Sequence, residues 1–439
     1  MNSVPSLSPT RREVLKTGAT AAAGTVLVPW AVSAPRAGRE VLRVGLIGCG
    51  GRGTGAAAQA LRADPDTELV AMGDAFSDHL ENSLSTLSRT GDIADRVKVD
   101  VDHKFTGFDA FQKVIDASDV VLLATSPYFR PEHVEYAVEQ GKHLFVEKPV
   151  ATDGPGIRRI WDASQKADEK GLSLVSGLCY RYQFAKRATI ERIHQGKIGK
   201  IRALQCTYNT GELWHRGRKD SWTEMEYQMR NWLYFAWLSG DHIAEQHIHS
   251  LDKLAWAMDD VYPVKATASG GRSKRTDPKY GNIYDHFNTV YEWEDGTVGF
   301  SSCRQMSGCS SNVSDHVYGT EGVAHIQSHR METDDGEKWR YRLAPEDASH
   351  LRRGTADDMY QNEHDALFWS IRQGEPINNG EYMCKSTMMA IMARMAAYTG
   401  QTIKWEDAWN SSEDLAPEVH AFGDAPQRPV AIPGVTKFS

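Results

Sequence analysis

Residues 41–53 read VLRVGLIGCGGRG, a short apolar run that ends in a cluster of glycines. The apolar run predicts a β-strand, and the alanine-rich residues after the glycines predict a helix. The turn between them has the form G-x-G-x-x-G, in which Gly48 permits a tight turn, Gly50 lets a pyrophosphate approach the backbone, and Gly53 lets helix and strand pack closely. The stretch therefore predicts the start of a dinucleotide-binding α/β domain, although the motif alone has low specificity.

A second predicted strand, residues 68–73, leads directly into Asp74. An acidic residue about 20 positions after such a glycine turn accepts hydrogen bonds from ribose hydroxyls and repels a 2′-phosphate. The next four residues, AFSD, contain no arginine that would offset this repulsion. The pattern favours NAD over NADP, and a helix-capping role for Asp74 is the alternative.

Further alternation of strand and helix patterns predicts a doubly wound parallel sheet. The additional elements are two strands and an intervening helix, residues 119–128, 142–149 and 131–141. Because the carboxyl ends of parallel strands face the ligand crevice, Ser126, Pro127, Glu147 and Lys148 are expected beside the cofactor. A lysine there can donate a proton or stabilise an alkoxide; an ordinary surface lysine is the alternative.

The stretch HIAEQHIHSLD, residues 242–252, concentrates histidines and carboxylates. On one continuous helix, His242, Glu245, His249 and Asp252 would share a face. A histidine beside a carboxylate has a fixed tautomer and a favoured charged form, which suits a general base. A metal site made by His242, Glu245 and His249, or a purely structural helix, are the alternatives.

Four segments together resemble the glucose–fructose oxidoreductase/inositol dehydrogenase (Gfo/Idh/MocA) family. They are the GCGGRG turn, Asp74, the segment TSPYFRPEH and, most specifically, EKPVATD, residues 147–153. The resemblance covers residues from about 41 to 405. It implies a catalytic lysine at Lys148, and it places Arg52 and His133, together with the crevice residues above, in the cofactor site.

The same resemblance implies that His249 is the general base. Glu245 stands where the family usually has an aspartate, so the carboxylate that would orient the base is carried on a side chain one methylene longer. His247 stands where the family usually has a small residue, which alters the expected substrate pocket. The chemistry requires no metal ion, because NAD is the electrophile.

The second half is predicted to be rich in β-strands from about residue 200, with a hairpin at Asp295-Gly296, before it returns to helix. The fold class is therefore an N-terminal Rossmann domain followed by an α+β domain. The resemblance implies a large open, mostly antiparallel sheet in the second domain, whose broad face forms a homodimer or homotetramer. The expected divisions are residues 1–34, a signal peptide; 40–160, the Rossmann domain; 161–410, the second domain; and 411–439, a tail.

A small-molecule carbohydrate is the expected substrate. Residues 210–240 are rich in tryptophan, tyrosine and arginine, and such side chains suit the apolar faces and hydroxylated rims of sugars. Packing or an oligomer contact is the alternative. Arg181, Tyr182, His247 and His286 are further candidate substrate residues.

Two functions of different classes remain open. The first is a sugar or polyol oxidoreductase, in which His249 takes a hydroxyl proton and Lys148 supports the oxygen. The second is an NAD-dependent glycosidase or lyase that oxidises its substrate only transiently. The intact EKP motif favours the first. A cofactor-binding protein without catalysis is disfavoured because both catalytic residues are present.

The N-terminal residues predict export. Arg11-Arg12, an apolar stretch and the small residues before position 35 resemble a twin-arginine signal, which exports folded proteins; a disordered basic tail is the alternative. A periplasmic enzyme would need a tightly held cofactor. Beyond the signal no apolar run has the length of a membrane span, and the net charge of −8 disfavours a nucleic-acid partner. The six cysteines show no disulfide framework, so buried free thiols are expected.

Overall fold

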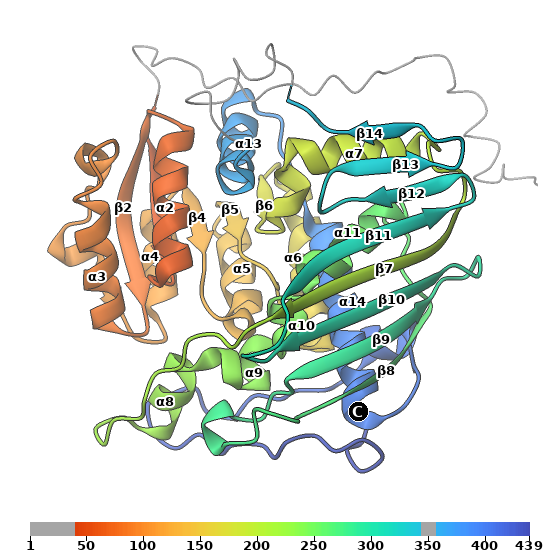
Figure 1. The fold of residues 1–439 in the computed structure, drawn as a ribbon. Helices are drawn as coiled ribbons and strands as arrows, with labels where there is room; N and C mark the ends of the chain where they lie inside the picture. Colours follow the sequence, from red (N-terminus) through yellow and green to blue (C-terminus); the bar gives the residue numbers. More distant parts are fainter. Residues whose placement is uncertain (1–39, 344–356) are drawn as a thin grey trace, which may run out of the picture.

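The computed structural model describes residues 40–343 and 357–439, which form two sheets with their flanking helices (Figure 1). The predicted signal peptide, residues 1–34, lies outside the described residues. No helix in the described part is both long and apolar enough to cross a membrane. All six cysteines are free thiols, and only Cys309 is exposed.

The N-terminal sheet is wholly parallel, which confirms the predicted Rossmann arrangement. Its strand order is β3-β2-β1-β4-β5-β6. The strands are β1 (Leu42–Ile47), β2 (Thr67–Asp74), β3 (Lys104–Thr106), β4 (Val120–Leu123), β5 (His143–Val146) and β6 (Leu174–Ser176). The chain crosses from one side of β1 to the other between β3 and β4, and ligands bind in the crevice at such a reversal of strand order.

Helices cover both faces of this sheet (Figure 1). They are α2 (Gly51–Ala63), α3 (Ser77–Leu87), α4 (Ala110–Ala117), α5 (Arg130–Glu139), α6 (Gly154–Glu169) and, from the C-terminal half, α13 (Met359–Gln373). α13 packs Ala366, Leu367 and Phe368 into the same apolar cluster as α2. Residues from within the predicted second domain therefore help to enclose the first.

The second sheet has nine strands in the order β14-β13-β12-β11-β7-β10-β9-β8-β15. They are β7 (Ile201–Thr210), β8 (Lys265–Gly271), β9 (His286–Glu292), β10 (Val298–Gln305), β11 (Asn312–Gly319), β12 (Gly322–His325), β13 (Arg330–Thr333), β14 (Lys338–Arg340) and β15 (Ile403–Lys404). Only β7 and β10 pair in parallel, and the predicted hairpin joins β9 to β10. The expected open, mostly antiparallel sheet is confirmed.

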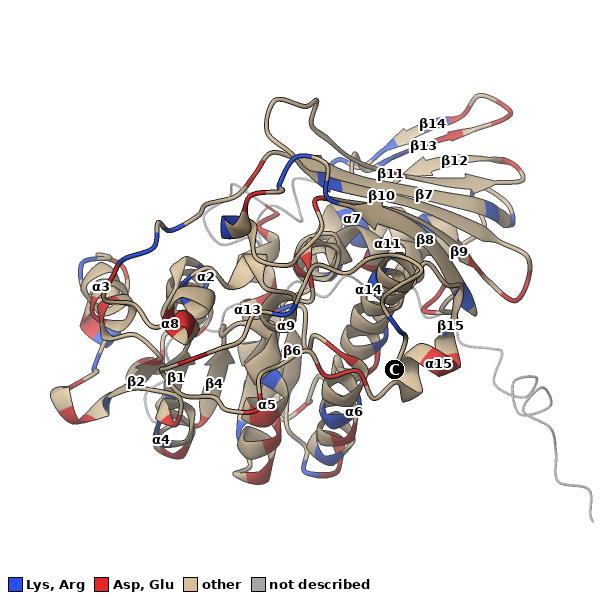
Figure 2. Ribbon diagram, turned by 90° about the horizontal axis from the view of Figure 1, so that it is seen from below, with Lys and Arg blue, Asp and Glu red and all other residues tan. Residues whose placement is uncertain are grey.

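One face of the large sheet is covered by α7 (Phe184–His194), α11 (Ile248–Ala257) and α14 (Gly380–Thr399) (Figure 2). Its other face carries no described helix in this view. That face exposes apolar side chains, among them Val290, Phe300 and Tyr318.

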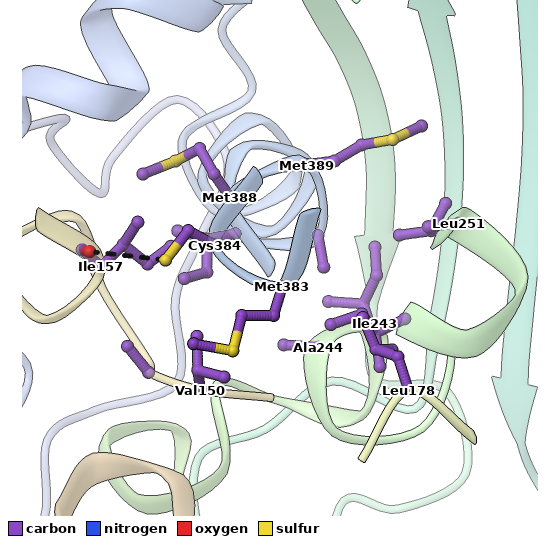
Figure 3. Packing of buried hydrophobic residues seen from close by; sticks show 14 of the residues in the cluster. Val150, Ile157, Leu178, Ile243, Ala244, Leu251, Met383, Cys384, Met388 and Met389 are labelled. Carbon is purple, nitrogen blue, oxygen red and sulfur yellow. Dashed lines mark hydrogen bonds between the residues drawn. The ribbon is translucent and has the colours of Figure 1, made fainter. Parts of the chain in front are cut away.

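α14 joins the two domains through a methionine-rich core. Met383, Met388 and Met389 are fully buried, and the flexible thioether side chains fill the irregular space between elements (Figure 3). Their neighbours include Val150 near the end of β5 and Leu251 of α11. The methionine stripe of α14 is therefore core, and it packs against segments of both domains.

Candidate functional site

The glycine turn is shaped for a close ligand. Gly48 has a φ of +94°, in the left-handed region, and a Cβ at Gly53 would lie 1.8 Å from the carbonyl oxygen of Gly48. Neither position tolerates a side chain. A Cβ at Gly50 would meet no atom within 4 Å, so the backbone there opens onto free space at the N-terminus of α2, where N–H groups and the helix dipole favour phosphate.

This turn forms one wall of a cavity of about 370 Å³. Thr125 Oγ1 and His133 Nδ1 line it as buried polar atoms without hydrogen-bond partners among the described residues. The predicted cofactor residues that line it are Gly48, Gly50, Arg52, Gly53, Asp74, Ser126 and His133. Bare glycine backbone, a helix N-terminus and unpaired polar atoms together fit the adenosine and phosphate part of a dinucleotide.

Asp74 braces the turn as well as lining the cavity. Its Oδ2 accepts from the backbone N–H of Cys49 at 2.6 Å, and its Oδ1 accepts from that of Phe76 at 2.9 Å. The carboxylate is thus held at the end of β2, where ribose hydroxyls would lie. Both the predicted ribose role and a local backbone-capping role are compatible with this placement.

Arg52 lines the cavity, but carboxylates engage its guanidinium. Nε donates to Glu147 and Nη2 donates to Glu363 Oε1 at 2.7 Å. Glu147 is buried and, like Pro127, does not line the cavity. These contacts fasten the glycine turn to the end of β5, so Arg52 and Glu147 position the site rather than present free charges to a phosphate.

Lys148, directly after Glu147, reaches into the second domain. Its Nζ donates to the carbonyl oxygen of Glu245 and lies 3.2 Å from Glu245 Oε1. Both side chains are 15% exposed. Two predicted catalytic residues almost 100 positions apart are therefore brought together at the junction of the domains.

The prediction of one continuous helix through HIAEQHIHSLD is wrong. The segment forms two helices, α10 (His242–Glu245) and α11, separated at Gln246 and His247. His242 contacts β10 through Nε2, which lies 3.5 Å from Cys303 Sγ, and its Nδ1 lies 3.0 Å from Oδ1 of the preceding residue, Asp241. The described residues contain no cluster of three potential metal ligands, so the proposed metal set is not assembled.

His249 lies in the first turn of α11 with its ring 5.0 Å from that of Tyr180. Its Nδ1 is buried and has no hydrogen-bond partner in the described chain. Burial lowers the pKa of His249 well below its usual value, and the positive charge of Lys148 and Lys253 lowers it further. The imidazole is therefore neutral, which is the form that a general base has before it takes a proton.

This environment corrects two expectations. Glu245 bonds to Lys148, and no hydrogen bond joins it to His249 within the residues described. The surroundings favour the neutral imidazole, whereas the sequence predicted a carboxylate that would favour the charged form. Asp252 also has other partners than His249, because its carboxylate accepts hydrogen bonds from Arg181 and Ser386.

Three of the four further substrate candidates have structural roles. Arg181 is buried, and its guanidinium is bound by Asp252 and by Asp260. Tyr182 is buried and donates to Asn379 Oδ1 at 2.6 Å. His247 is fully buried, with Nε2 2.6 Å from Ser301 Oγ.

The fourth, His286, is partly exposed on β9 and contacts Asp285. No described hydrogen bond, ion pair or ring contact joins it to Lys148, Glu245 or His249. In the described residues, none of the four is joined to Lys148, Glu245 or His249 by a hydrogen bond, an ion pair or a ring contact.

Three residues that the sequence did not single out surround His249 instead. Tyr180 packs on it, and the ammonium groups of Lys186 and Lys253 lie 4.3 Å and 5.0 Å from the Tyr180 ring. Lys253 pairs with Asp315, and both are fully buried. Burial, reinforced by Lys253, lowers the pKa of Lys186 to about 8. Lys253 lies one helical turn after His249, which is the only sequence signal that could have found it.

Comparisons with known proteins agree with the two-domain fold. Residues 42–175 match the model of an oxidoreductase family with an NAD-binding Rossmann fold, and residues 187–325 match the Gfo/Idh/MocA C-terminal domain. These matched ranges contain the glycine turn and the candidate catalytic residues Lys148, Glu245 and His249. The first range identifies NAD as the cofactor of the N-terminal domain.

Among curated relatives, the chain is 28% identical over 179 residues to glycosyl hydrolase family 109 protein 1 of Bacteroides thetaiotaomicron, covering 40% of this chain and 36% of that protein. It is 28% identical over 258 residues to inositol 2-dehydrogenase 3 of Saccharopolyspora erythraea, covering 58% of this chain and 64% of that one. The alignments thus span between 36% and 64% of these relatives.

Solved structures share the fold over most of the chain. An aldose-aldose oxidoreductase from Caulobacter crescentus, complexed with glycerol, has a TM-score of 0.62 at 19% identity, covering 83% of this chain and 100% of that one. A levoglucosan dehydrogenase in complex with NADH and levoglucosan has a TM-score of 0.63 at 18% identity, covering 83% and 99%.

Proposed function

The chain belongs to the Gfo/Idh/MocA family, and from this premise we propose that it is an NAD-dependent oxidoreductase acting on a hydroxyl of a sugar or polyol. The contact between Lys148 and Glu245 carries the proposal, because it joins the cofactor domain to the segment that bears His249. The sugar and polyol enzymes among the relatives support the substrate class.

Each residue has a distinct role in the proposed reaction. Bound NAD supplies the hydride acceptor. His249, neutral because it is buried among cations, accepts the hydroxyl proton. The Lys148 ammonium, held by Glu245, donates a hydrogen bond to the substrate oxygen and stabilises the negative charge that develops there. Glu245 positions Lys148 rather than His249.

A second candidate function is glycoside cleavage through transient oxidation. The similarity to glycosyl hydrolase family 109 proteins favours it, as does 27% identity over 180 residues to 2,7-anhydro-N-acetylneuraminate hydratase of Escherichia coli. Such a reaction uses the same bound NAD and an additional proton removal beside the oxidised carbon. The two functions differ in whether reduced cofactor or a second reduced product accumulates.

Export through the twin-arginine route, with the periplasm as destination, is part of the proposal and rests on the sequence of residues 1–34. A protein exported in the folded state can carry its cofactor with it, whereas free NAD is scarce outside the cytoplasm. We therefore expect the cofactor to be tightly bound and to be regenerated on the enzyme by a second substrate.

A homodimer or homotetramer through the open sheet face is the proposed assembly. The exposed side chains of Val290 on β9, Phe300 on β10 and Tyr318 on β11 support it. Light scattering of the wild type and of Phe300→Glu tests it: a fall in mass for the variant supports this interface, and an unchanged oligomer places the interface elsewhere.

The experiment that tests the function combines ligand identification with a substrate screen. Purified protein is denatured, and the released cofactor is identified by mass spectrometry. The folded protein is then supplied with a panel of sugars, polyols and glycosides while reduced nicotinamide is followed by its near-ultraviolet absorbance. The proposal is supported if a polyol or sugar reduces the bound NAD of the wild type and does not reduce that of a His249→Ala variant. A protein that binds no NAD, or that cleaves glycosides without redox products, contradicts it.

A further inference from the structure

We propose that the second domain contributes its own phosphate-binding residue, Arg216, to the dinucleotide site, on a clasp formed by residues 212–232 and held shut by residues 420–425. The inference rests on the proposed use of NAD. It assigns a retention function to residues that lie outside the Rossmann domain.

The cavity at the glycine turn has walls from both domains. One wall is made by the nucleotide-binding sheet and its loops, including Asp74 and Phe76. The opposite wall is made by side chains that follow β7, with two tryptophans among them. They are Trp214, Arg216, Met229, Arg230 and Trp232. A dinucleotide in this cavity would therefore be enclosed from the side that the Rossmann fold alone leaves open.

The backbone of Arg216 is fixed by one buried amide. Its N–H donates to Asn231 Oδ1 at 2.8 Å, and its carbonyl oxygen accepts from Asn231 Nδ2 at 3.1 Å. Asn231 is fully buried. The exposed Arg216 guanidinium lies 5.2 Å from the centre of the Trp214 ring, and it forms no ion pair with a carboxylate of residues 40–343 or 357–439. A guanidinium on a fixed backbone, with no carboxylate partner among the described residues, at the edge of this cavity matches the bidentate recognition that arginine gives to phosphate.

Arg230 fastens the clasp to the Rossmann domain. Its two terminal nitrogens each donate to a carboxylate oxygen of Asp78 at 3.0 Å. Its guanidinium also lies 3.9 Å from the centre of the Phe76 ring. Because Asp78 and Glu226 bind Arg230, Arg230 closes the clasp, and Arg216 is the cation left for the ligand.

The C-terminal tail holds the clasp from outside. Within α8 (Glu224–Arg230), the Met225 N–H donates to the carbonyl oxygen of Gly423 at 3.0 Å, and Gln228 Nε2 donates to that of Ala425 at 2.7 Å. Phe422 packs 5.7 Å from Phe76, centre to centre. Figure 2 shows α8 beside α3 of the Rossmann domain. The clasp thus lies between the two domains and the tail, and release of the dinucleotide requires these contacts to open together.

The test measures how fast NADH leaves the protein. Protein loaded with NADH is mixed with excess NAD, and energy transfer from tryptophan to NADH is followed over time. The variants are Arg216→Ala, Asp78→Ala to unfasten Arg230, and Arg218→Ala as the control. Arg218 lies on the same segment but binds Glu224 and does not line the nucleotide cavity. Circular dichroism and the midpoint of thermal unfolding of the free proteins confirm that each variant is folded.

Loss of a charge-assisted bond to phosphate is expected to speed NADH release about 10- to 100-fold in Arg216→Ala. Asp78→Ala is expected to speed it as well, while Arg218→Ala matches the wild type. Release from Arg216→Ala at the wild-type rate overturns the proposal. Repeating the measurement with NADPH locates the contact: an effect confined to NADPH places Arg216 at the 2′-phosphate and also overturns the assignment. A wild-type protein that binds neither cofactor contradicts the proposed function instead.

Discussion

Replacement of Lys148 by methionine removes an ammonium group and keeps the length of the aliphatic chain. The Lys148 and Glu245 side chains are each 15% exposed and 3.2 Å apart. The variant leaves the Glu245 carboxylate partly buried without its cation. This is expected to lower the free energy of unfolding by about 1–3 kcal/mol, a smaller loss than breaking a fully buried ion pair would cause. The loss of the donor to the substrate oxygen is expected to lower kcat about 10²- to 10⁴-fold.

The assay separates these two effects. Formation of the oxidised product gives kcat and KM, chemical denaturation gives the free energy of unfolding, and the released cofactor gives occupancy. Lys142→Met is the matched control, because Lys142 lies at the opposite end of β5 and donates to the carbonyl oxygen of Ser118. In the double variant Lys148→Met/Glu245→Gln the unpaired charge is gone, so stability is expected to recover while kcat stays low.

Two results would refute this reasoning. A kcat for Lys148→Met within about threefold of the wild type would show that the ammonium does not act on the reacting oxygen. Recovery of kcat together with stability in the double variant would show that the activity loss of the single variant came from misfolding of the site.

Three further predictions concern the cofactor turn, the nucleotide preference and the base. Gly53→Ala is expected to abolish NAD binding in a dialysis assay, because the new Cβ would meet the Gly48 carbonyl oxygen at 1.8 Å, whereas Gly51→Ala, with open space, is expected to bind normally. Asp74→Ala is expected to weaken NAD more than NADP in calorimetric titrations, since its carboxylate lines the cavity and is proposed to accept from the ribose hydroxyls; an unchanged ratio would assign it to capping alone. The pH at which kcat/KM falls on the acidic side is expected to lie below the usual histidine pKa of about 6.5, because the pKa of His249 is lowered. In Lys148→Met, the residual activity is expected to fall at a higher pH than in the wild type, because one of the charges that lower this pKa is gone. A fall near pH 6.5 in the wild type would contradict the buried-base assignment.

The sign of the histidine effect also bears on stability. A folded-state pKa below the unfolded value means that the unfolded chain binds more protons as the pH falls below about 6.5. Burial lowers the pKa of His133 to about 3, and that of His249 is lowered as well. Both groups therefore leave stability intact above about pH 6.5 and reduce it progressively below that value.

The nucleotide-binding half was accessible to sequence reasoning because its signals are local. Gly48, Gly50 and Gly53 act within one turn, and the alternation of strand and helix patterns predicts a parallel sheet. Lys148 was found for the same reason, since it follows a strand whose carboxyl end must face the crevice. The structure shows that this lysine contacts Glu245, a partner that the sequence did not predict.

The substrate side was less accessible because its contacts are distant in sequence. The helix break at Gln246 and His247 has no proline or glycine to announce it. Arg181 looked like a substrate residue, but Asp252 and Asp260 bind it from another part of the chain. Periodicity predicts which residues share a helix face, but it does not predict which distant residues pack against that face. The roles of such polar residues therefore became clear only from the tertiary structure.

The central claim, net hydride transfer from a sugar or polyol hydroxyl, is tested most directly with substrate deuterated at the oxidised carbon. After turnover, mass spectrometry locates the deuterium in cofactor, product and recovered substrate, and the same reaction in deuterated water reports exchange at the neighbouring carbon. The account predicts deuterium on the nicotinamide or on a second, reduced product, with no solvent exchange at the neighbour. Deuterium returned to the same carbon of the cleaved sugar, with solvent hydrogen incorporated beside it and no net NADH, would contradict it.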